Sequence, residues 1–419
     1  MADLSEFHNA EAGMSRAKPP TTSFQFKPGA EIGEAELYLS GDETAQDALD
    51  KWAALLLGLD YGTMSILEVL EVRAWGENPS TGEPYRYVKA AVRKAKQQDL
   101  AIAQTADKWL AQHPRKPRKA KPARKTGTRA SEWWPITDTQ LGKDGEERFG
   151  GLSETMARLD WVVDAFTEWH EQRKKIGYTA ERIIIPFAGD TTEGCHGSFD
   201  NQPWVTALNA ADQQELAVAA AERVIERAIE LAPEVIITGV ASNHDRQSRV
   251  NTKENVTDAW DDRTFVLLRT LGRIYHRVGY SQVSVQMPAN PHVSVIDDGF
   301  LNVATIHGHK PKWTQNAAQT MWRWWGQEIA NRRDASACQV LLAGHYHHAY
   351  ELGPQSGRML IGLPSLDGGS AWFEATGQDW SLPGVRPFLT TAEGVRELSM
   401  LVWPEDRRQA EEQTGGKVA

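Results

Sequence analysis

The chain has 419 residues, of which 41% are hydrophobic and 24% are charged, and its formal net charge at pH 7 is −10. This composition is typical of a globular protein, and the length exceeds that of one ordinary domain. No apolar run approaches the roughly 18–20 residues that a membrane span needs, and the N-terminus lacks the basic start and apolar stretch of a secretory signal. Because only Cys195 and Cys338 occur, no disulfide framework is expected, which favours a cytoplasmic protein without membrane association.

The first 112 residues divide into two predicted parts. Residues 1–42 contain Pro, Gly, Ser and Thr without periodicity, which predicts a disordered tail. Residues 43–112 follow a helical pattern, with one apolar face around Leu49 and another around Tyr87. The turn-rich stretch between them, WGENPSTGEPY, is suited to the loop of a small β-hairpin. We therefore expect a small, mainly helical module of the winged-helix-like type.

Residues 113–130, HPRKPRKAKPARKTGTRA, form a strongly basic segment. They hold eight Lys or Arg residues, three Pro residues and no acidic residue. This composition predicts an extended linker between two domains. Two interpretations stay open, namely a solvated linker or one that also contacts the phosphate backbone of a nucleic acid.

Strands and helices alternate from residue 131 to residue 404, which predicts an α/β fold with helices layered on sheets. Strands are expected in the segments WWPITD, RIIIPFAGD, EVIITGVASN, FLNVATIHG, QVLLAGHYH and RMLIGLPS. Helices are expected at about 153–177, 210–233, 263–278 and 316–333. Residues 405–419 are expected to be a polar tail.

Metal-binding residue types follow five of these expected strands. They are Asp138, Asp190, Asn243 with His244, His307 with His309, and His345 with His347 and His348. Ligands of α/β sheets bind outside the carboxyl ends of the strands, so these side chains are expected to converge. One such residue is more often simply hydrogen-bonded, but five in order favour a site. Carboxylate, amide and imidazole groups suit divalent Mn, Fe, Zn or Ni, and this number suits two ions that share a carboxylate and clamp a phosphoryl oxygen.

The ordered set Asp-x-Gln, Gly-Asp, Asn-His-Asp, His-Gly-His and Gly-His-x-His spans about residues 132–370. It resembles the calcineurin-like metallophosphoesterase family. The resemblance implies a double β-sandwich flanked by helices, with a dimetal site at the strand ends. It also implies these ligands: Asp138 and His347 for the first ion, Asp190 as the bridge, and Asn243, His307 and His345 for the second ion.

The same resemblance implies roles for residues that follow these ligands. His244 would protonate the leaving oxygen or stabilise developing charge, and Asp245 would orient His244 or hold its proton. Arg246 is either a phosphate contact or part of a surface salt bridge. His309 and Lys310 are either substrate-binding or structural.

Two positions depart from the usual motifs of the family. The first motif usually reads Asp-x-His, whereas Gln140 stands in the third position here, and Ser242 stands where Gly is usual. Gln140 could bind an ion through its amide oxygen or hydrogen-bond a metal-bound water. The first ion is therefore expected to bind more weakly or to be a harder metal.

The prediction is a hydrolase, a phosphoesterase with two divalent ions, of which Mn²⁺ is favoured and Fe, Zn, Ni or Mg are alternatives. A phosphodiester of nucleic acid is the expected substrate, cleaved by DNA exo- or endonuclease action. The alternatives are a phosphatase or phosphodiesterase of a small nucleotide or phosphoprotein, and a catalytically weak DNA-binding protein. A further resemblance, to phage-encoded phosphoesterases, would place the protein in the host cytoplasm. The oligomeric state stays open. Six tryptophans are expected to be mostly core, with a minority stacking on bases: Trp204, Trp313, Trp322, Trp324, Trp325 and Trp372.

Overall fold

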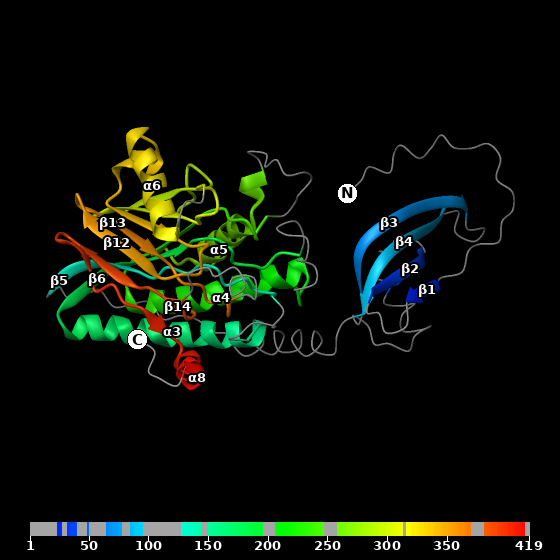
Figure 1. The fold of residues 1–419 in the computed structure, drawn as a ribbon, viewed down its shortest axis with the longest axis horizontal. Helices are drawn as coiled ribbons and strands as arrows, with labels where there is room; N and C mark the ends of the chain where they lie inside the picture. Colours follow the sequence, from blue (N-terminus) through cyan, green and yellow to red (C-terminus); the bar gives the residue numbers. More distant parts are fainter. Residues whose placement is uncertain are drawn as a thin grey trace. The chain divides into compact units, whose positions relative to one another are not determined.

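The computed structural model describes residues 23–26, 32–39, 48–49, 64–77, 84–94, 127–143, 150–195, 206–246, 258–312, 316–369 and 381–414. The chain divides into two compact units, residues 1–101 and 102–419. Figure 1 follows both units along the sequence, from blue at the N-terminus to red at the C-terminus.

The first unit contains a four-stranded antiparallel sheet. In spatial order its strands are β1 (Ser23–Phe26), β2 (Ile32–Leu39), β4 (Pro84–Lys94) and β3 (Met64–Glu77). The long strands β3 and β4 form a hairpin in which Glu77 lies opposite Pro84, so the hairpin predicted from WGENPSTGEPY is confirmed. Lys89 of β4 pairs with Glu34 of β2 at 2.6 Å.

The prediction of a mainly helical module is wrong for the described part of residues 43–112. Val88, Ala90 and Val92 alternate along β4 and are buried, and they share a core with Leu37 and Leu49. Burial of every second residue is typical of a strand. The prediction was wrong because the adjacent apolar pairs of this segment also match one face of a helix. Strands β1 and β2 likewise replace part of the expected disordered tail. Residues 113–126 of the basic segment and most of the helix expected around Leu49 lie outside the described residues.

The second unit contains two larger sheets. One consists, in spatial order, of β16 (Gly394–Arg396), β15 (Phe388–Thr391), β5 (Thr128–Trp133), β6 (Tyr178–Phe187), β7 (Val235–Gly239) and β8 (Val283–Val285). The other consists of β12 (Tyr350–Gln355), β13 (Arg358–Gly362), β11 (Val340–Ala343), β10 (Asn302–Ile306) and β9 (Ser294–Asp297). Strands β5 to β8 are parallel, as are β10, β11 and β13. A short pair, β14 (Gly384–Val385) and β17 (Leu401–Val402), completes the strands of the described part.

The described helices confirm most of the predicted pattern. They are α3 (Leu152–Lys175), α4 (Ala210–Leu231), α5 (Arg263–Val278), α6 (Ala317–Ala330) and α8 (Pro404–Thr414), with 3-10 turns η3 (Asp258–Asp261) and η4 (Asp334–Ala337). Helix α5 shows why its bounds were predictable. Asp262 caps its first turn by accepting a hydrogen bond from Thr264 N at 2.9 Å, and Gly279 ends it with a left-handed φ of 76°. Helix α8 lies in the segment predicted to be a polar tail; the segment is polar, but its helical structure was not predicted.

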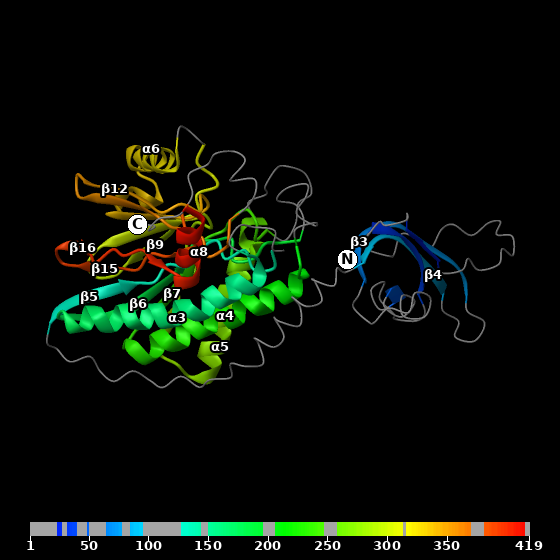
Figure 2. The ribbon, with the colours of Figure 1, turned by 60° about the horizontal axis from the view of Figure 1, so that its bottom comes forward.

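The two sheets of the second unit share a core. Ile184 of β6 and Leu342 of β11 both belong to the apolar cluster between the sheets. The neighbouring Ile183 and Ile185 point to the other face of β6, where α3, α4 and α5 cover the sheet. Helix α6 covers the outer face of the second sheet, into which it buries Trp325. Figure 2 shows α3, α4 and α5 on one side of the sheets and α6 on the other. This layering makes the unit a mixed α/β structure with parallel strands that end at common edges.

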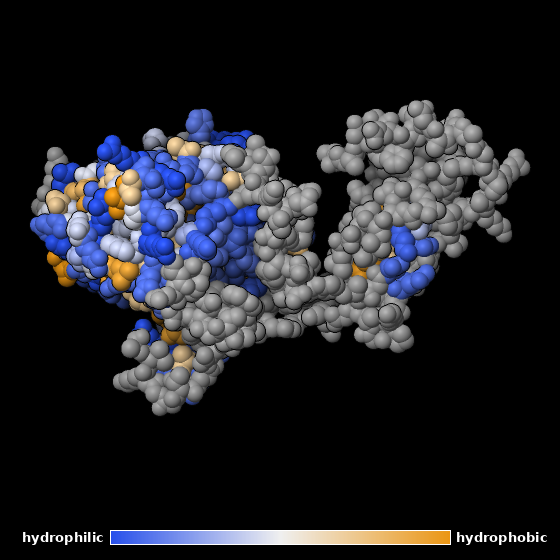
Figure 3. Space-filling view, turned by 45° about the horizontal axis from the view of Figure 1, so that its top comes forward, coloured by the Kyte–Doolittle hydropathy of each residue, from blue (hydrophilic) through white to orange (hydrophobic). Residues whose placement is uncertain are grey.

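The surface of the second unit is mainly hydrophilic on the face drawn in Figure 3, with small and scattered apolar areas. The large hydrophobic side chains that are exposed among the described residues are Ile176, Val278, Met287 and Val295. No described helix is both long and apolar enough to cross a bilayer.

Candidate metal centre

The segments that follow β5 and β6 bring Asp138 and Asp190 to the same edge of the six-stranded sheet of the second unit. Asp138 N donates to Gly189 O and Gln140 N donates to Asp190 O, both at 3.0 Å, so the two segments run side by side. Asp138 and Asp190 share a left-handed φ of 49°, which residues with a Cβ adopt uncommonly. This shared backbone conformation places two buried carboxylates next to each other.

One half of the centre, called the Asp190 half below, consists of Asp190, Asn243, His307 and His345. It brings together one carboxylate, one amide and two imidazoles. His307 Nε2 lies 3.0 Å from Asp190 Oδ2 and 2.8 Å from Asn243 Oδ1, while His307 Nδ1 lies 2.9 Å from Ala188 O. Donor atoms of Asp190, His307 and His345 all lie within 4.8 Å of one another. This set fits a divalent ion of the Mn, Fe, Zn or Ni type, because it offers oxygen and imidazole nitrogen at one point.

Electrostatics around Asp190 favour a bound cation. Burial alone would raise the pKa of Asp190, but His307 and His244 hold it well below its usual range. Burial would lower the pKa of His307, but Asp190 raises it to about 9, so the negative field of this half favours positive charge at the ring. Burial and the charge of His307 lower the pKa of His345 to about 3 and keep its ring neutral, as a metal ligand requires.

The Asp138 half is built around a carboxylate and His347. His347 Nε2 lies 3.2 Å from Asp138 Oδ1, and His345 N donates to Asp138 Oδ2 at 3.0 Å. Asp138 Oδ1 is buried and accepts no hydrogen bond within the described residues. His347 Nδ1 lies 3.8 Å from Asp367 Oδ2 on the side away from Asp138. A buried oxygen of this kind, facing an imidazole, fits a place for a cation.

Two glycines are required by the close approach of the ligands. A Cβ at Gly189 would lie 2.8 Å from His307 Nδ1, and a Cβ at Gly344 would lie 2.8 Å from Asp138 Oδ2. Both are below the separations that real Cβ atoms tolerate. The Gly-Asp and Gly-His motifs therefore have a packing reason as well as a chemical one.

His244 lies beside Asp190 and is paired with Glu193. His244 N donates to Asp190 Oδ1 at 2.9 Å, and His244 Nδ1 lies 3.1 Å from Glu193 O and 3.3 Å from Glu193 Oε1. Burial would lower the pKa of His244, but Glu193 and Asp190 raise it to about 10. The ring therefore carries a proton at neutral pH.

The structure differs from the prediction for Asp245. Its carboxylate accepts hydrogen bonds from Thr191 N and Thr192 N, both at 2.8 Å, from Thr192 Oγ1 at 2.7 Å and from Thr264 Oγ1 at 2.9 Å. These bonds tie the loop that carries Asp190 to the start of α5. Asp245 thus braces the loop, and Glu193 takes the place beside His244 that was predicted for Asp245.

The predicted substrate-binding residues flank the Asp190 half. The ring of His309 lies 5.3 Å from that of His307 and 5.7 Å from that of His292, which was not predicted. Both ring nitrogens of His309 are buried and have no hydrogen-bond partner within the described residues. Arg246 Nε donates to Ser242 O at 3.2 Å, and partial burial with the charge of Arg246 lowers the pKa of Lys310 to about 8.

Gln140 is held by a lysine that the sequence did not point to. Lys143 Nζ donates to Gln140 Oε1 at 3.2 Å, to Asp367 Oδ2 at 2.7 Å and to Gly369 O at 2.6 Å. Asp367 follows β13 in the segment PSLDGG, so the rule that polar residues follow strands could have found it. Glu193 could have been found in the same way, three residues after Asp190.

Of the six tryptophans, Trp325 is buried in the core, and Trp322 and Trp324 pack against that core. The other three, Trp204, Trp313 and Trp372, lie outside the described residues. Trp322, Trp324 and Trp325 therefore have the core role that was predicted for most of the six.

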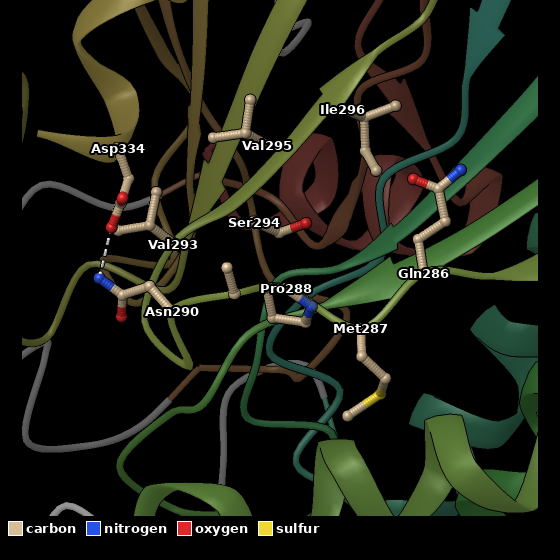
Figure 4. A pocket seen from close by; sticks show the side chains of 10 residues that line it. Gln286, Met287, Pro288, Asn290, Val293, Ser294, Val295, Ile296 and Asp334 are labelled. Atoms are coloured by element: carbon tan, nitrogen blue, oxygen red, sulfur yellow. Dashed lines mark hydrogen bonds between the residues drawn. The ribbon is translucent and has the colours of Figure 1, made fainter.

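A separate pocket of about 240 Å³ lies next to β9 (Figure 4). It is lined by residues between 286 and 296 and by Asp334, which accepts a hydrogen bond from Asn290 at 2.7 Å. None of the predicted ligands lines it. The converging ligands, and not this pocket, therefore define the candidate site.

Comparisons with known proteins complete the description of the centre. No protein-family model and no curated protein matches this chain. Among solved structures, a Vps29 from Entamoeba histolytica complexed with Zn²⁺ is 10% identical and covers 64% of this chain and 98% of its own, with a TM-score of 0.28. Vps29 from Chaetomium thermophilum is 8% identical over 65% of this chain and 96% of its own, with a TM-score of 0.30. A dimetal phosphatase from Danio rerio is 11% identical over 65% of this chain and 99% of its own, with a TM-score of 0.29. Values this low support no inference about activity, which has to come from the geometry of the centre.

Proposed function

We propose that this chain is a phosphoesterase that depends on divalent metal ions. The observation that carries the proposal is the convergence of Asp190, His307 and His345 within 4.8 Å, with His244 beside them, held by Asp190 and Glu193. The ordered motifs that resemble the calcineurin-like metallophosphoesterases support it as well. Metal ligands next to a positioned acid suit metal-assisted hydrolysis better than a structural metal site, which is usually closed by thiolates and imidazoles.

The residues that would hold the ions fall into the two halves described above. Asp190, Asn243, His307 and His345 would hold one ion, and Asp138, His347 and Asp190 would hold the other, with Mn²⁺ as the favoured metal. When bound, such ions lower the pKa of water and offset negative charge on phosphoryl oxygens.

His244 would supply the proton that the leaving oxygen needs. Its ring is protonated at neutral pH because Glu193 and Asp190 raise its pKa to about 10. The contact of His244 Nδ1 with Glu193 fixes the ring and leaves Nε2 as the nitrogen on the side of Asp190, 4.0 Å from Asp190 Oδ2. A positioned acid of this kind contributes about 10²–10⁴-fold to a rate.

Hydrolysis of an aryl phosphodiester and an aryl phosphomonoester tests the proposal. We expect turnover in the presence of Mn²⁺, loss of turnover on chelation and recovery when Mn²⁺ is restored. A protein that binds Mn²⁺ but hydrolyses neither ester, nor DNA, would contradict the proposal and favour a DNA-binding role.

A nucleic acid is the substrate class that we propose. The basic segment 113–130 leads into β5 of the second unit, and Arg246 and Lys310 flank the Asp190 half near His309. Such cations favour a polyanion, and binding through phosphates makes affinity fall with salt.

The test of the substrate neutralises charge instead of deleting the segment, because residues 128–130 belong to β5. The full chain with Gln at every Lys and Arg between residues 115 and 125 should cleave the aryl phosphodiester normally. Its cleavage of DNA should weaken and depend less steeply on salt. If the parent protein hydrolyses nucleotides or phosphoproteins but not DNA, the substrate is a small phosphoester or a phosphoprotein instead.

A further inference from the structure

Lys143 forms a buried network behind the Asp138 half. Its ammonium group contacts Gln140 Oε1, Asp367 Oδ2 and Gly369 O at 2.6–3.2 Å, and its side chain is only 10% exposed. The carboxylate of Asp367 is 2% exposed and is the group that faces His347 Nδ1 at 3.8 Å. The network therefore reaches both Gln140 and His347.

This network changes what Gln140 can offer to an ion. An amide oxygen that faces an ammonium group at 3.2 Å is already polarised by a positive charge. A divalent ion on the same oxygen would bring two like charges close together in a poorly solvated place, where their repulsion is only weakly screened. Gln140 is therefore better suited to hold Lys143 than to bind a metal.

The network also weakens the negative field on this side. Asp367 is the carboxylate next to His347, and Lys143 neutralises it through a direct ion pair at 2.7 Å. A carboxylate behind a ligating imidazole normally raises the basicity of that ligand. Here the ammonium group offsets that effect.

The arrangement of the donor atoms also differs between the Asp190 half and the Asp138 half. Within the described residues, Asp190, His307 and His345 form the single group of three or more His, Cys, Asp or Glu side chains close enough to hold one ion. Asp138 and His347 face each other at 3.2 Å but belong to no such group.

We infer that the centre binds divalent ions unequally, with one ion held tightly in the Asp190 half and Lys143 acting as a positioning residue that keeps the Asp138 half weak. This inference rests on the metal site of the proposed function but not on the reaction. The physical cause is the pairing of Lys143 with Gln140 and Asp367, which withholds one oxygen ligand and one negative charge from the ion of the Asp138 half.

Titration of the metal-free full chain with Mn²⁺ tests the inference, with metal analysis after dialysis and electron paramagnetic resonance as readouts. The parent protein should retain one Mn²⁺ with the spectrum of an isolated ion, and a second should bind at least about tenfold more weakly. Gln140→His should tighten the binding of the weaker ion, that of the Asp138 half, by about 10–100-fold, the usual range of effects from residues around a metal site. Its spectrum should then show two coupled ions. Lys143→Met should act in the same direction.

Lys174→Met is the matched control, because Lys174 is 61% exposed on α3. It should leave both binding steps unchanged. The inference is overturned if the parent protein binds two ions with equal affinity, or if Gln140→His leaves the second step unchanged. Gln140→His keeps the test decisive even if Lys143→Met fails to fold. Absence of any Mn²⁺ binding would overturn the proposed function together with the inference, whereas two equal ions with normal hydrolysis would overturn the inference alone.

Discussion

His244 Nδ1 lies 3.3 Å from Glu193 Oε1, and this contact joins two residues from different strand ends. Glu193 follows β6 and His244 follows β7. The neighbour of His244 in the sequence, Asp245, has its carboxylate occupied by Thr191, Thr192 and Thr264. The ring of His244 is therefore held by a contact across the sheet edge and not by the neighbouring residue of its own motif.

Replacement of Glu193 by Gln should lower the pKa of His244, because the charge that raises it to about 10 is lost. The ring of His244 would then lose its proton at a lower pH, so the alkaline limb of the pH–rate profile should move to lower pH. Turnover at pH 8 should fall by about tenfold or more, while the Mn²⁺ content stays as in the parent. Glu171→Gln, on the exposed side of α3, is the control. An unchanged alkaline limb would show that Glu193 does not set the protonation of His244.

Replacement of Asp190 by Asn should abolish metal binding and turnover together, because in the proposed centre Asp190 would supply the carboxylate that both ions share. Mn²⁺ should raise the melting temperature of the parent protein, since it binds only the folded state, but not that of Asp190→Asn. Calorimetry with and without Mn²⁺ measures the melting temperature of the parent protein and of Asp190→Asn. In contrast, His244→Asn should keep the metal-induced shift and lose turnover. An equal loss of the shift in both variants would remove the distinction between ligand and acid.

Replacement of Asp245 by Asn should reduce stability more than it changes the pH profile. Thr191 N and Thr192 N donate to different oxygens of Asp245, and Asn keeps only one of these acceptors, so one bond is lost at a cost of about 1–3 kcal/mol. Urea denaturation measures the free energy of unfolding. A shift of the alkaline limb without a loss of stability would instead favour the role predicted for Asp245 from the sequence.

Replacement of Arg158 by Met should destabilise the second unit. Arg158 is fully buried and forms two hydrogen bonds with Asp406 of α8, at 2.6 and 2.8 Å. Loss of one partner of a buried ion pair costs about 3–5 kcal/mol.

The loss should depend on pH in a definite direction. Burial raises the pKa of Asp406 even with Arg158 present, and removal of Arg158 raises it further. The unpaired group is therefore neutral at low pH, and the deficit in unfolding free energy should be smaller at pH 4 than at pH 7. Arg408→Ala, at an exposed position of α8, should change stability by less than about 0.5 kcal/mol. A deficit that is equal at both pH values would contradict this account of the pair.

The convergence of the proposed ligands could be predicted because each one follows, within a few residues, a strand whose apolar run is visible in the sequence. Helix α5 could be predicted because its apolar residues recur with helical periodicity and because Asp262 and Gly279 mark its two ends. The partners of the ligands are different. Lys143 and Asp367 are 224 residues apart in the sequence, so only the folded chain brings them together.

Helix α8 and strand β4 were not predicted, for a related reason. Helix α8 is polar along its length, and its docking depends on the contact between Asp406 and Arg158, 248 residues away. Strand β4 carries small and branched residues that match both a helical and an alternating pattern. Its pairing with β2 and β3 decides between the two, and local sequence alone cannot show that pairing.

Four of the proposed ligands, Asp138, Asp190, His345 and His347, have left-handed backbone conformations. Each such conformation costs on the order of 1–3 kcal/mol, which the surrounding layers must hold in place. The ligands are thus preorganised before any ion arrives, so little conformational entropy remains to be lost when the ion binds. Loosening these turns would therefore weaken the affinity for metal even where every ligand atom is kept.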